Sequence, residues 1–152
     1  MITYGVESLK DCLDEMKPLL EKHWEEIAHH KDKIKLNPNY EQYLSMEEMG
    51  LVHTCTVRDE GKLIGYFVSF IVPNLHYQDH LWAMNDILFL EPAYRGDGRT
   101  AFQLLSFAEE MLIELGVSVI QLHMKIDFPF EPLAEACGYK KVEYNYSKYV
   151  GE

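Results

Sequence analysis

The stretch Asn85–Leu105, NDILFLEPAYRGDGRTAFQLL, decides the fold because an apolar strand, a glycine turn and a helix follow one another in it. Glycines let a backbone turn tightly, and the first amides of a helix have no partner within that helix. Arg95 and Arg99 add positive charge to the turn, which is therefore typical of a cradle for an anion such as pyrophosphate. The alternative is an ordinary strand-to-helix turn whose arginines neutralise Glu91 and Asp97.

Hydrophobic periodicity places the other elements around this motif. Strands are expected over residues 2–6, 51–57, 63–72, 81–90 and 117–126, and a Tyr-rich closing strand in KKVEYNYSKYV, residues 140–150. Helices are expected over residues 9–27, with Ser8 as the cap, and over residues 40–49, 100–115 and 132–137. The order β-α-α-β-β-β-α-β-α-β predicts one domain over residues 1–152, a three-layer α/β/α fold with a mixed, mainly antiparallel central sheet.

Composition excludes several classes of protein. The 152 residues carry 25 acidic and 14 basic side chains, a net charge of −11, which argues against a nucleic acid partner. Three widely spaced cysteines, without any CxxC pair, predict neither disulfides nor a zinc site, and they favour a reducing, cytoplasmic location. No basic start leads into an apolar stretch and no window approaches 18 apolar residues, so we expect neither export nor a membrane span.

The glycine-turn stretch resembles motif A of the GNAT superfamily of acyl-CoA N-acyltransferases, an apolar strand followed by Pro-x-Tyr, Arg-x-x-Gly-x-Gly/Ala and a long helix. The residues that match are Pro92, Tyr94, Arg95, Gly96 and Gly98. Thr100 departs from the pattern, since the family usually has Gly or Ala there. Residues 133–139, LAEACGY, resemble the family's final helix and Gly-Phe ending, so the resemblance spans essentially the whole chain. HWEE, GYFVSF, NLHY and YSKY look like small members encoded by bacteriophages, which would place the protein in the host cytoplasm.

This resemblance implies acetyl-CoA as the acetyl donor, without a metal, and direct transfer to a primary amine of a small molecule or a protein. In the family the fourth strand splays from the fifth, and its backbone pairs with the pantetheine arm of the coenzyme. An amide at that place can also stabilise the tetrahedral oxyanion. The residues expected to bind the coenzyme are Leu88, Phe89, Leu90, Arg95, Gly96, Asp97, Gly98, Arg99 and Thr100.

Asp86 is the first candidate for the base that deprotonates the amine. By strand alternation it shares a face with Leu88 and Leu90, while Asn85 faces the other way. Burying a carboxyl group in an apolar strand costs free energy, so its presence there indicates a specific role. A structural aspartate in an ion pair is the alternative. The competing bases are His123 on the next strand and Glu26 or His23 late in the first helix.

The general acid is where the chain departs from the family. Many members carry a tyrosine in Leu-Tyr-x-x-x-Gly-Phe, and Ala134 stands at that place here. Tyr144 or Tyr146 on the closing strand would substitute, with Tyr146 as the candidate, unless these tyrosines only pack the sheet or water protonates the thiolate. The residues expected on the acceptor side are His23, Glu26, His76 and Tyr77.

Two other functions compete with an enzyme. The chain would bind acyl-CoA without turnover if Ala134 means a lost acid, or it would inhibit a host factor as an acidic mimic of nucleic acid. A mimic needs no Arg-x-x-Gly-x-Gly turn, so the enzyme is favoured. The acidic surplus would attract a cationic acceptor, although it equally serves solubility. Homodimers are common in such folds, but no heptad pattern identifies an interface.

Overall fold

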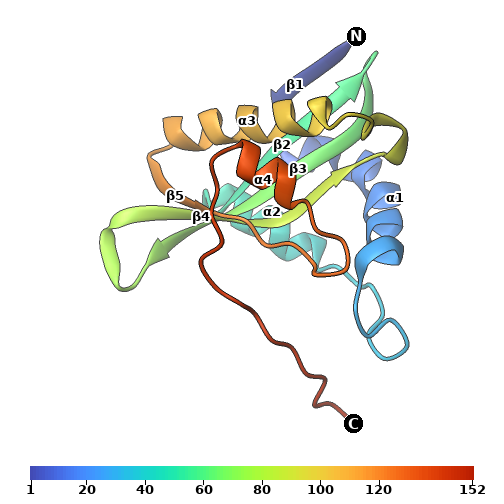
Figure 1. The fold of residues 1–152 in the computed structure, drawn as a ribbon, viewed down its shortest axis with the longest axis vertical. Coiled ribbons are helices and arrows are strands. Elements are labelled where there is room, and N and C mark those ends of the chain that lie inside the picture. The colour runs from blue at the N-terminus through green and yellow to red at the C-terminus, as the bar shows by residue number, and fades with distance from the viewer.

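A five-stranded sheet is the centre of the computed structural model, which describes residues 1–152 (Figure 1). Its strands lie in chain order: β1 Ile2–Val6, β2 Val52–Asp59, β3 Lys62–Asn74, β4 Tyr77–Leu90 and β5 Val117–Gln121. The first four run antiparallel to their neighbours, and β5 runs parallel to β4. The expected mixed, mainly antiparallel sheet is therefore confirmed.

Helices cover both faces of the sheet and give three layers (Figure 1). One face carries α1 Leu9–Ile27 and α2 Tyr40–Glu48; the other carries α3 Arg99–Glu114 and the short α4 Glu131–Ala136. A single 3-10 turn, η1 Pro92–Tyr94, precedes the glycine turn. None of the helices combines the length and the apolar character that crossing a membrane requires.

The two long helices, α1 and α3, are each held by the apolar stripe that the sequence predicts. Cys12 and Met16 of α1 are buried against Tyr66 and Phe89 of the sheet. On the opposite face the buried stripe of α3 consists of Leu104, Leu105, Ala108 and Leu112. Burying a large apolar side chain contributes about 1.5–3 kcal/mol, so these two stripes fix both helices on the sheet.

The cap of α1 differs from the expectation. The Ser8 side chain does not cap the helix; its hydroxyl donates to Glu47 Oε1 over 2.8 Å. Glu47, from the end of α2, accepts the Leu9 amide at Oε2 over 2.7 Å. A carboxylate at a helix N-terminus is favoured by the helix dipole, so a residue distant in sequence takes the place of the local cap.

At the C-terminal end one expected strand is shorter than predicted and the closing strand is wrong. The strand expected over residues 117–126 ends at Gln121, and residues 140–152 form no strand. A segment with alternating apolar residues forms a stable strand only where it can pair with the edge of a sheet and bury its apolar side chains in a core. In the tail Val142, Tyr144 and Tyr146 are all largely exposed, with Tyr146 92% accessible, and the chain runs away from the sheet (Figure 1).

Candidate functional site

The sheet opens between β4 and β5. These strands pair only from Leu81 opposite Val117 to Met84 opposite Gln121, while β4 continues to Leu90 along β3 alone. The β4 edge beyond Met84 therefore has no strand partner. This is the divergence of the fourth and fifth strands that the resemblance implied, and it leaves backbone groups of β4 facing an opening.

Asn85 closes the base of this opening. Its Nδ2 donates to the His123 carbonyl oxygen over 3.0 Å, and its Oδ1 accepts the His123 amide over 2.5 Å. The side-chain amide thus replaces a backbone neighbour at the first position where β5 is too far away to pair. The sequence did not predict a role for Asn85. It is a polar residue in an apolar strand, however, and that same feature made Asp86 a candidate.

A β-bulge in β4 turns Asp86 toward the α1–α2 face of the sheet. Val68 lies opposite Ile87 and Ser69 opposite Asn85, so Asp86 is an extra residue without a partner on β3. The expectation that Asp86 shares the face of Leu88 and Leu90 is wrong, because the extra residue breaks the alternation. Leu88 and Leu90 pack in the α3 core, whereas Asp86 Oδ2 accepts a hydrogen bond from Tyr43 Oη of α2 over 2.5 Å.

Burial controls the protonation of Asp86. It raises the pKa of the carboxyl above its ordinary value, and the hydrogen bond from Tyr43 opposes this rise by favouring the charged form. Asp86 forms no ion pair. A carboxylate in this environment binds a proton more tightly than an exposed one, which suits a group that accepts a proton from a substrate.

The glycine turn leads directly into α3, as the sequence predicts. Gly98 has φ +83°, a conformation that favours glycine, and it places the turn directly before α3. Four amides of the turn and the first helical residues donate no hydrogen bond within the chain: Gly96, Asp97, Thr100 and Ala101. Asp97 Oδ1 accepts the Arg99 amide over 3.0 Å. An anion at this helix N-terminus would share the turn with the Asp97 carboxylate.

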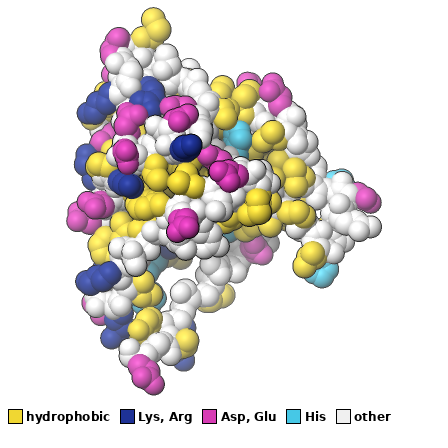
Figure 2. All heavy atoms as spheres, turned by 180° about the vertical axis from the view of Figure 1, so that it is seen from behind, with side chains coloured by type: hydrophobic (Ala, Val, Ile, Leu, Met, Phe, Trp, Pro, Cys, Tyr) yellow, Lys and Arg dark blue, Asp and Glu magenta, His cyan; other side chains and the backbone are white.

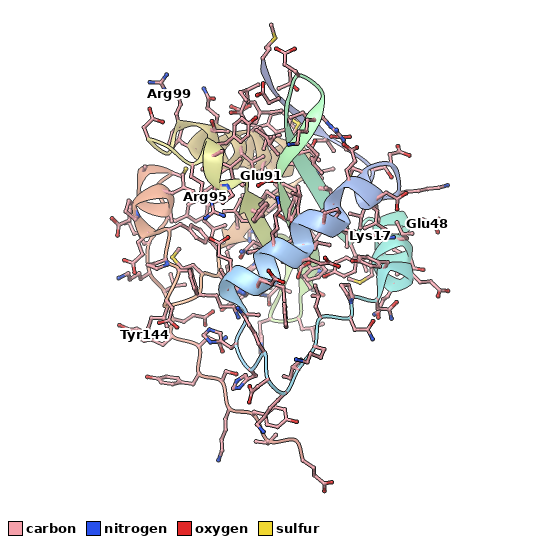
Figure 3. All side chains as sticks on the ribbon, turned by 90° about the vertical axis from the view of Figure 1, so that its right-hand side faces the viewer. Lys17, Glu48, Glu91, Arg95, Arg99 and Tyr144 are labelled. Atoms are coloured by element: carbon pink, nitrogen blue, oxygen red, sulfur yellow. The ribbon has the colours of Figure 1, made fainter.

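The two arginines of the turn point in different directions (Figure 3). Arg99 extends into solvent, 77% exposed, with its guanidinium 3.8 Å from the Asp97 carboxylate. Arg95 turns inward: its Nη atoms donate to the Glu26 carboxylate over 2.5 and 2.9 Å, and its Nε donates to the Leu90 carbonyl over 2.8 Å. Arg95 therefore ties the end of α1 to the end of β4, whereas Arg99 has only an exposed contact with Asp97.

Glu26 and His23, both on α1, differ in their ability to accept a proton. The bound Arg95 guanidinium lowers the pKa of Glu26, which makes Glu26 a weaker base than the sequence suggested. Burial lowers the pKa of His23, whose ring lies 5.4 Å from that of Phe89 on β4. A neutral imidazole beside the end of β4 keeps His23 as a second candidate base.

Three of the expected site residues lie away from the opening between β4 and β5. His76 and Tyr77 are at the tip of the β3–β4 hairpin, which projects from the body (Figures 1 and 2). Tyr146 is on the exposed tail, where nothing packs it toward the opening. His123 is at the base of the opening, held there through its backbone.

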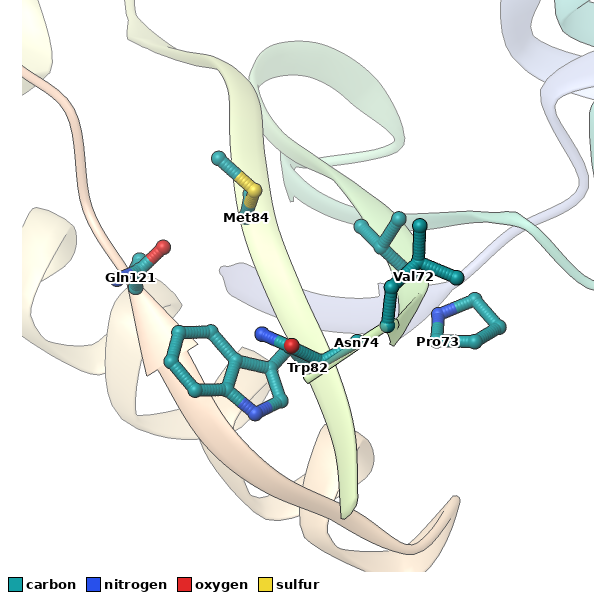
Figure 4. Close-up of a pocket in the computed structure, with 7 residues that line it drawn as sticks. Val72, Pro73, Asn74, Trp82, Met84 and Gln121 are labelled. Carbon is teal, nitrogen blue, oxygen red and sulfur yellow. The ribbon is translucent and has the colours of Figure 1, made fainter. Parts of the chain in front are cut away.

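A shallow cavity of about 230 Å³ lies on β4 between the hairpin tip and Asp86 (Figure 4). Its lining residues are Val72, Pro73, Asn74, Leu75, Trp82, Met84 and Gln121. Met84 lies opposite Phe70, whose ring stacks on Tyr43, so the cavity is on the same sheet face as Asp86. No group of three or more His, Cys, Asp or Glu side chains is placed to hold a metal ion.

Strands that diverge beside a glycine turn and a helix N-terminus are the features of an acyl-CoA-dependent transferase fold. The profile of the family described as "Acetyltransferase (GNAT) family" matches residues 13–139, and the chain belongs to this family. No significant match was found among curated proteins.

Solved structures share the fold at low sequence identity. An aminoglycoside acetyltransferase from an uncultured soil metagenomic sample is 16% identical with a TM-score of 0.76, and each chain covers 99% of the other. Glucosamine-6-phosphate N-acetyltransferase from Arabidopsis thaliana is 13% identical with a TM-score of 0.74, again with 99% of both chains covered. A predicted acetyltransferase from Clostridium acetobutylicum, solved with acetyl-CoA, is 14% identical with a TM-score of 0.70, covering 99% of this chain and 97% of that one.

Proposed function

We propose that this chain transfers the acetyl group of acetyl-CoA directly to a primary amine of a small molecule or a protein. One observation carries the proposal: a half-buried carboxyl, an unpaired strand edge and a turn of free amides follow one another within residues 85–101. A base, a site for an extended acyl carrier and an anion cradle are the parts that this reaction needs.

The residues present fit acetyl-CoA, the donor that the family uses. The free amides of the glycine turn suit the pyrophosphate, with Arg99 beside them. The β4 edge near Leu88 suits the amides of the pantetheine arm, because it lacks a strand partner beyond Met84. When bound there, the coenzyme supplies an activated thioester carbonyl.

The chain's own groups then handle protons and charge. Asp86 takes the proton of the attacking amine, and His23 is the alternative base. A backbone amide near Leu88 stabilises the developing oxyanion. Ala134 is buried and supplies no acid, and Tyr146 is exposed, so the thiolate leaving group takes its proton from water.

The acceptor is a primary amine of cationic character. Two similar structures carry the names of enzymes for aminoglycosides and glucosamine-6-phosphate, which are amino sugars. The net charge of −11 favours an approaching cation. Acidic and basic side chains are interspersed on the face seen in Figure 2, which gives no support to an acidic mimic of nucleic acid. Binding without turnover is likewise not favoured, and the cytoplasmic location, the bacteriophage origin and a homodimer remain predictions.

Thermal unfolding with acetyl-CoA, CoA and ATP in parallel tests the proposal. Each CoA compound at a hundred times its dissociation constant should stabilise the protein by about 2.7 kcal/mol, and ATP should not. A screen of amines for thiol release from acetyl-CoA follows. Equal stabilisation by ATP, or CoA binding without thiol release from any amine class, would contradict an acetyltransferase.

A further inference from the structure

The carboxyl of Asp86 has a single protein partner. Tyr43 Oη donates to Oδ2 over 2.5 Å, and no other side chain or backbone group donates to either carboxylate oxygen. Oδ1 is thereby left free. A carboxylate held at one oxygen keeps one orientation and presents the other oxygen to a substrate.

The groups that face Asp86 supply no cation. Tyr43 approaches it from α2 and Tyr66 from β3. From α1, His23 lies farther along β4, and Lys17 lies over the Tyr40 ring and pairs with Asp14 instead of Asp86. The Tyr66 hydroxyl is buried without any hydrogen-bond partner. The phenol of Tyr43 is therefore the one group that stabilises a negative charge on Asp86.

Tyr43 is itself held firmly. Its ring stacks on Phe70 with centroids 6.0 Å apart and an interplanar angle of 25°. Its helix, α2, is capped by the Asn39 side chain, which accepts the Gln42 amide over 3.0 Å. The hydroxyl can thus be removed while the ring and the helix keep their places.

We propose that Tyr43 is a positioning residue that fixes the orientation and the charge of Asp86 for proton transfer. The proposal rests on the proposed function, since it concerns the base of that reaction. Tyr43 does not touch the reacting atoms; it acts through the carboxylate that it binds.

The test replaces Tyr43 by Phe and measures the titration of Asp86 by NMR with carboxyl-labelled aspartate, the signal being assigned by its loss in Asp86→Asn. We expect Asp86 to titrate at higher pH in Tyr43→Phe, because burial then acts unopposed on its pKa. Tyr40→Phe is the matched control: Tyr40 is also on α2, its hydroxyl does not bind Asp86, and a phenyl ring keeps the contact with Lys17, so this variant should titrate like wild type. An identical titration in Tyr43→Phe and wild type would overturn the proposal.

Kinetics with an amine found in the screen separates the two proposals. In Tyr43→Phe, kcat should fall about tenfold with its acidic limb moved to higher pH, while KM for acetyl-CoA stays unchanged. If the titration moves but kcat and the pH profile do not, Tyr43 has no part in catalysis. If wild type acetylates no amine, the proposed function fails, whereas the NMR result still decides whether Tyr43 controls Asp86.

Discussion

The side-chain amide of Asn85 forms two hydrogen bonds with the backbone of His123, one through Nδ2 and one through Oδ1, at the point where β4 and β5 stop pairing. One side chain thus ends the ladder and begins the opening. The two bonds satisfy a buried amide, since Asn85 is only 8% exposed, and they set how far the segment after β5 stands from β4.

Replacing Asn85 by Ala should lower stability by about 2 kcal/mol and weaken acetyl-CoA binding, because backbone groups of His123 lose their partners and the opening loses its fixed width. Thermal unfolding and calorimetry measure both effects. Ser69→Ala is the control: Ser69 lies opposite Asn85, and its buried hydroxyl has no partner, so its loss should leave stability and affinity unchanged. Equal effects of the two variants would contradict a special role for Asn85.

Gly98→Ala should weaken acetyl-CoA binding at least tenfold, because a side chain at φ +83° strains the turn that we propose binds the pyrophosphate. Gly116→Ala, at the other end of α3, carries similar strain at φ +93°. Both variants should lose about 1 kcal/mol of stability. Only Gly98→Ala should lose affinity in calorimetry; an equal loss in Gly116→Ala would mean that α3 as a whole, and not the turn, is responsible.

Asp97→Asn should tighten acetyl-CoA binding about threefold, because the amide keeps the bond to the Arg99 backbone and removes a negative charge from the cradle. Raising the salt concentration should shrink the difference. Calorimetry at two salt concentrations measures it, and weaker binding in the variant would show that the carboxylate helps the coenzyme.

Glu26→Gln tests how Arg95 contributes. The ion pair between Arg95 and Glu26 is partly exposed to solvent, so it stabilises the fold by less than about 1 kcal/mol. The Tm of the variant should therefore fall only slightly. A freed guanidinium that turns to the phosphates should raise affinity for acetyl-CoA but not for pantetheine lacking phosphate. Unchanged affinity for both would confine Arg95 to joining α1 and β4.

Asp86→Asn should reduce kcat about 100-fold and leave the affinity for acetyl-CoA unchanged. The folded-state pKa of Asp86 is raised, so wild type loses stability as the pH rises through that pKa, whereas Asn does not titrate. The Tm of the variant should therefore exceed that of wild type at neutral pH, and the gap should close below the unfolded pKa. A wild-type kcat in the variant would move His23 forward as the base.

The sequence predicted the regular elements and the glycine turn, since these depend on local periodicity and backbone preference. Four helices and the first four strands were placed within a few residues. The tail around Tyr146 was not, because strand formation depends on a partner edge that no local pattern reports. Arg95 was expected to face a phosphate, but its partner Glu26 lies 69 residues away, and such pairs are decided by packing.

The extra residue at Asp86 also matters for comparing this chain with its relatives. Before the bulge the even-numbered residues of β4 face α2, and after it the odd-numbered residues do. Consider a related strand that lacks the extra residue. An ungapped alignment that matches the residues after the bulge then pairs Asp86 with a residue on the opposite face of that strand. Acidic residues found by such an alignment are the wrong ones to mutate. Deleting Asn85, with the pairing from Ile87 to Leu90 kept, would place Asp86 opposite Ser69 and move its carboxyl across the sheet, from the side of α2 to the core beneath α3, without altering the hydrophobic composition.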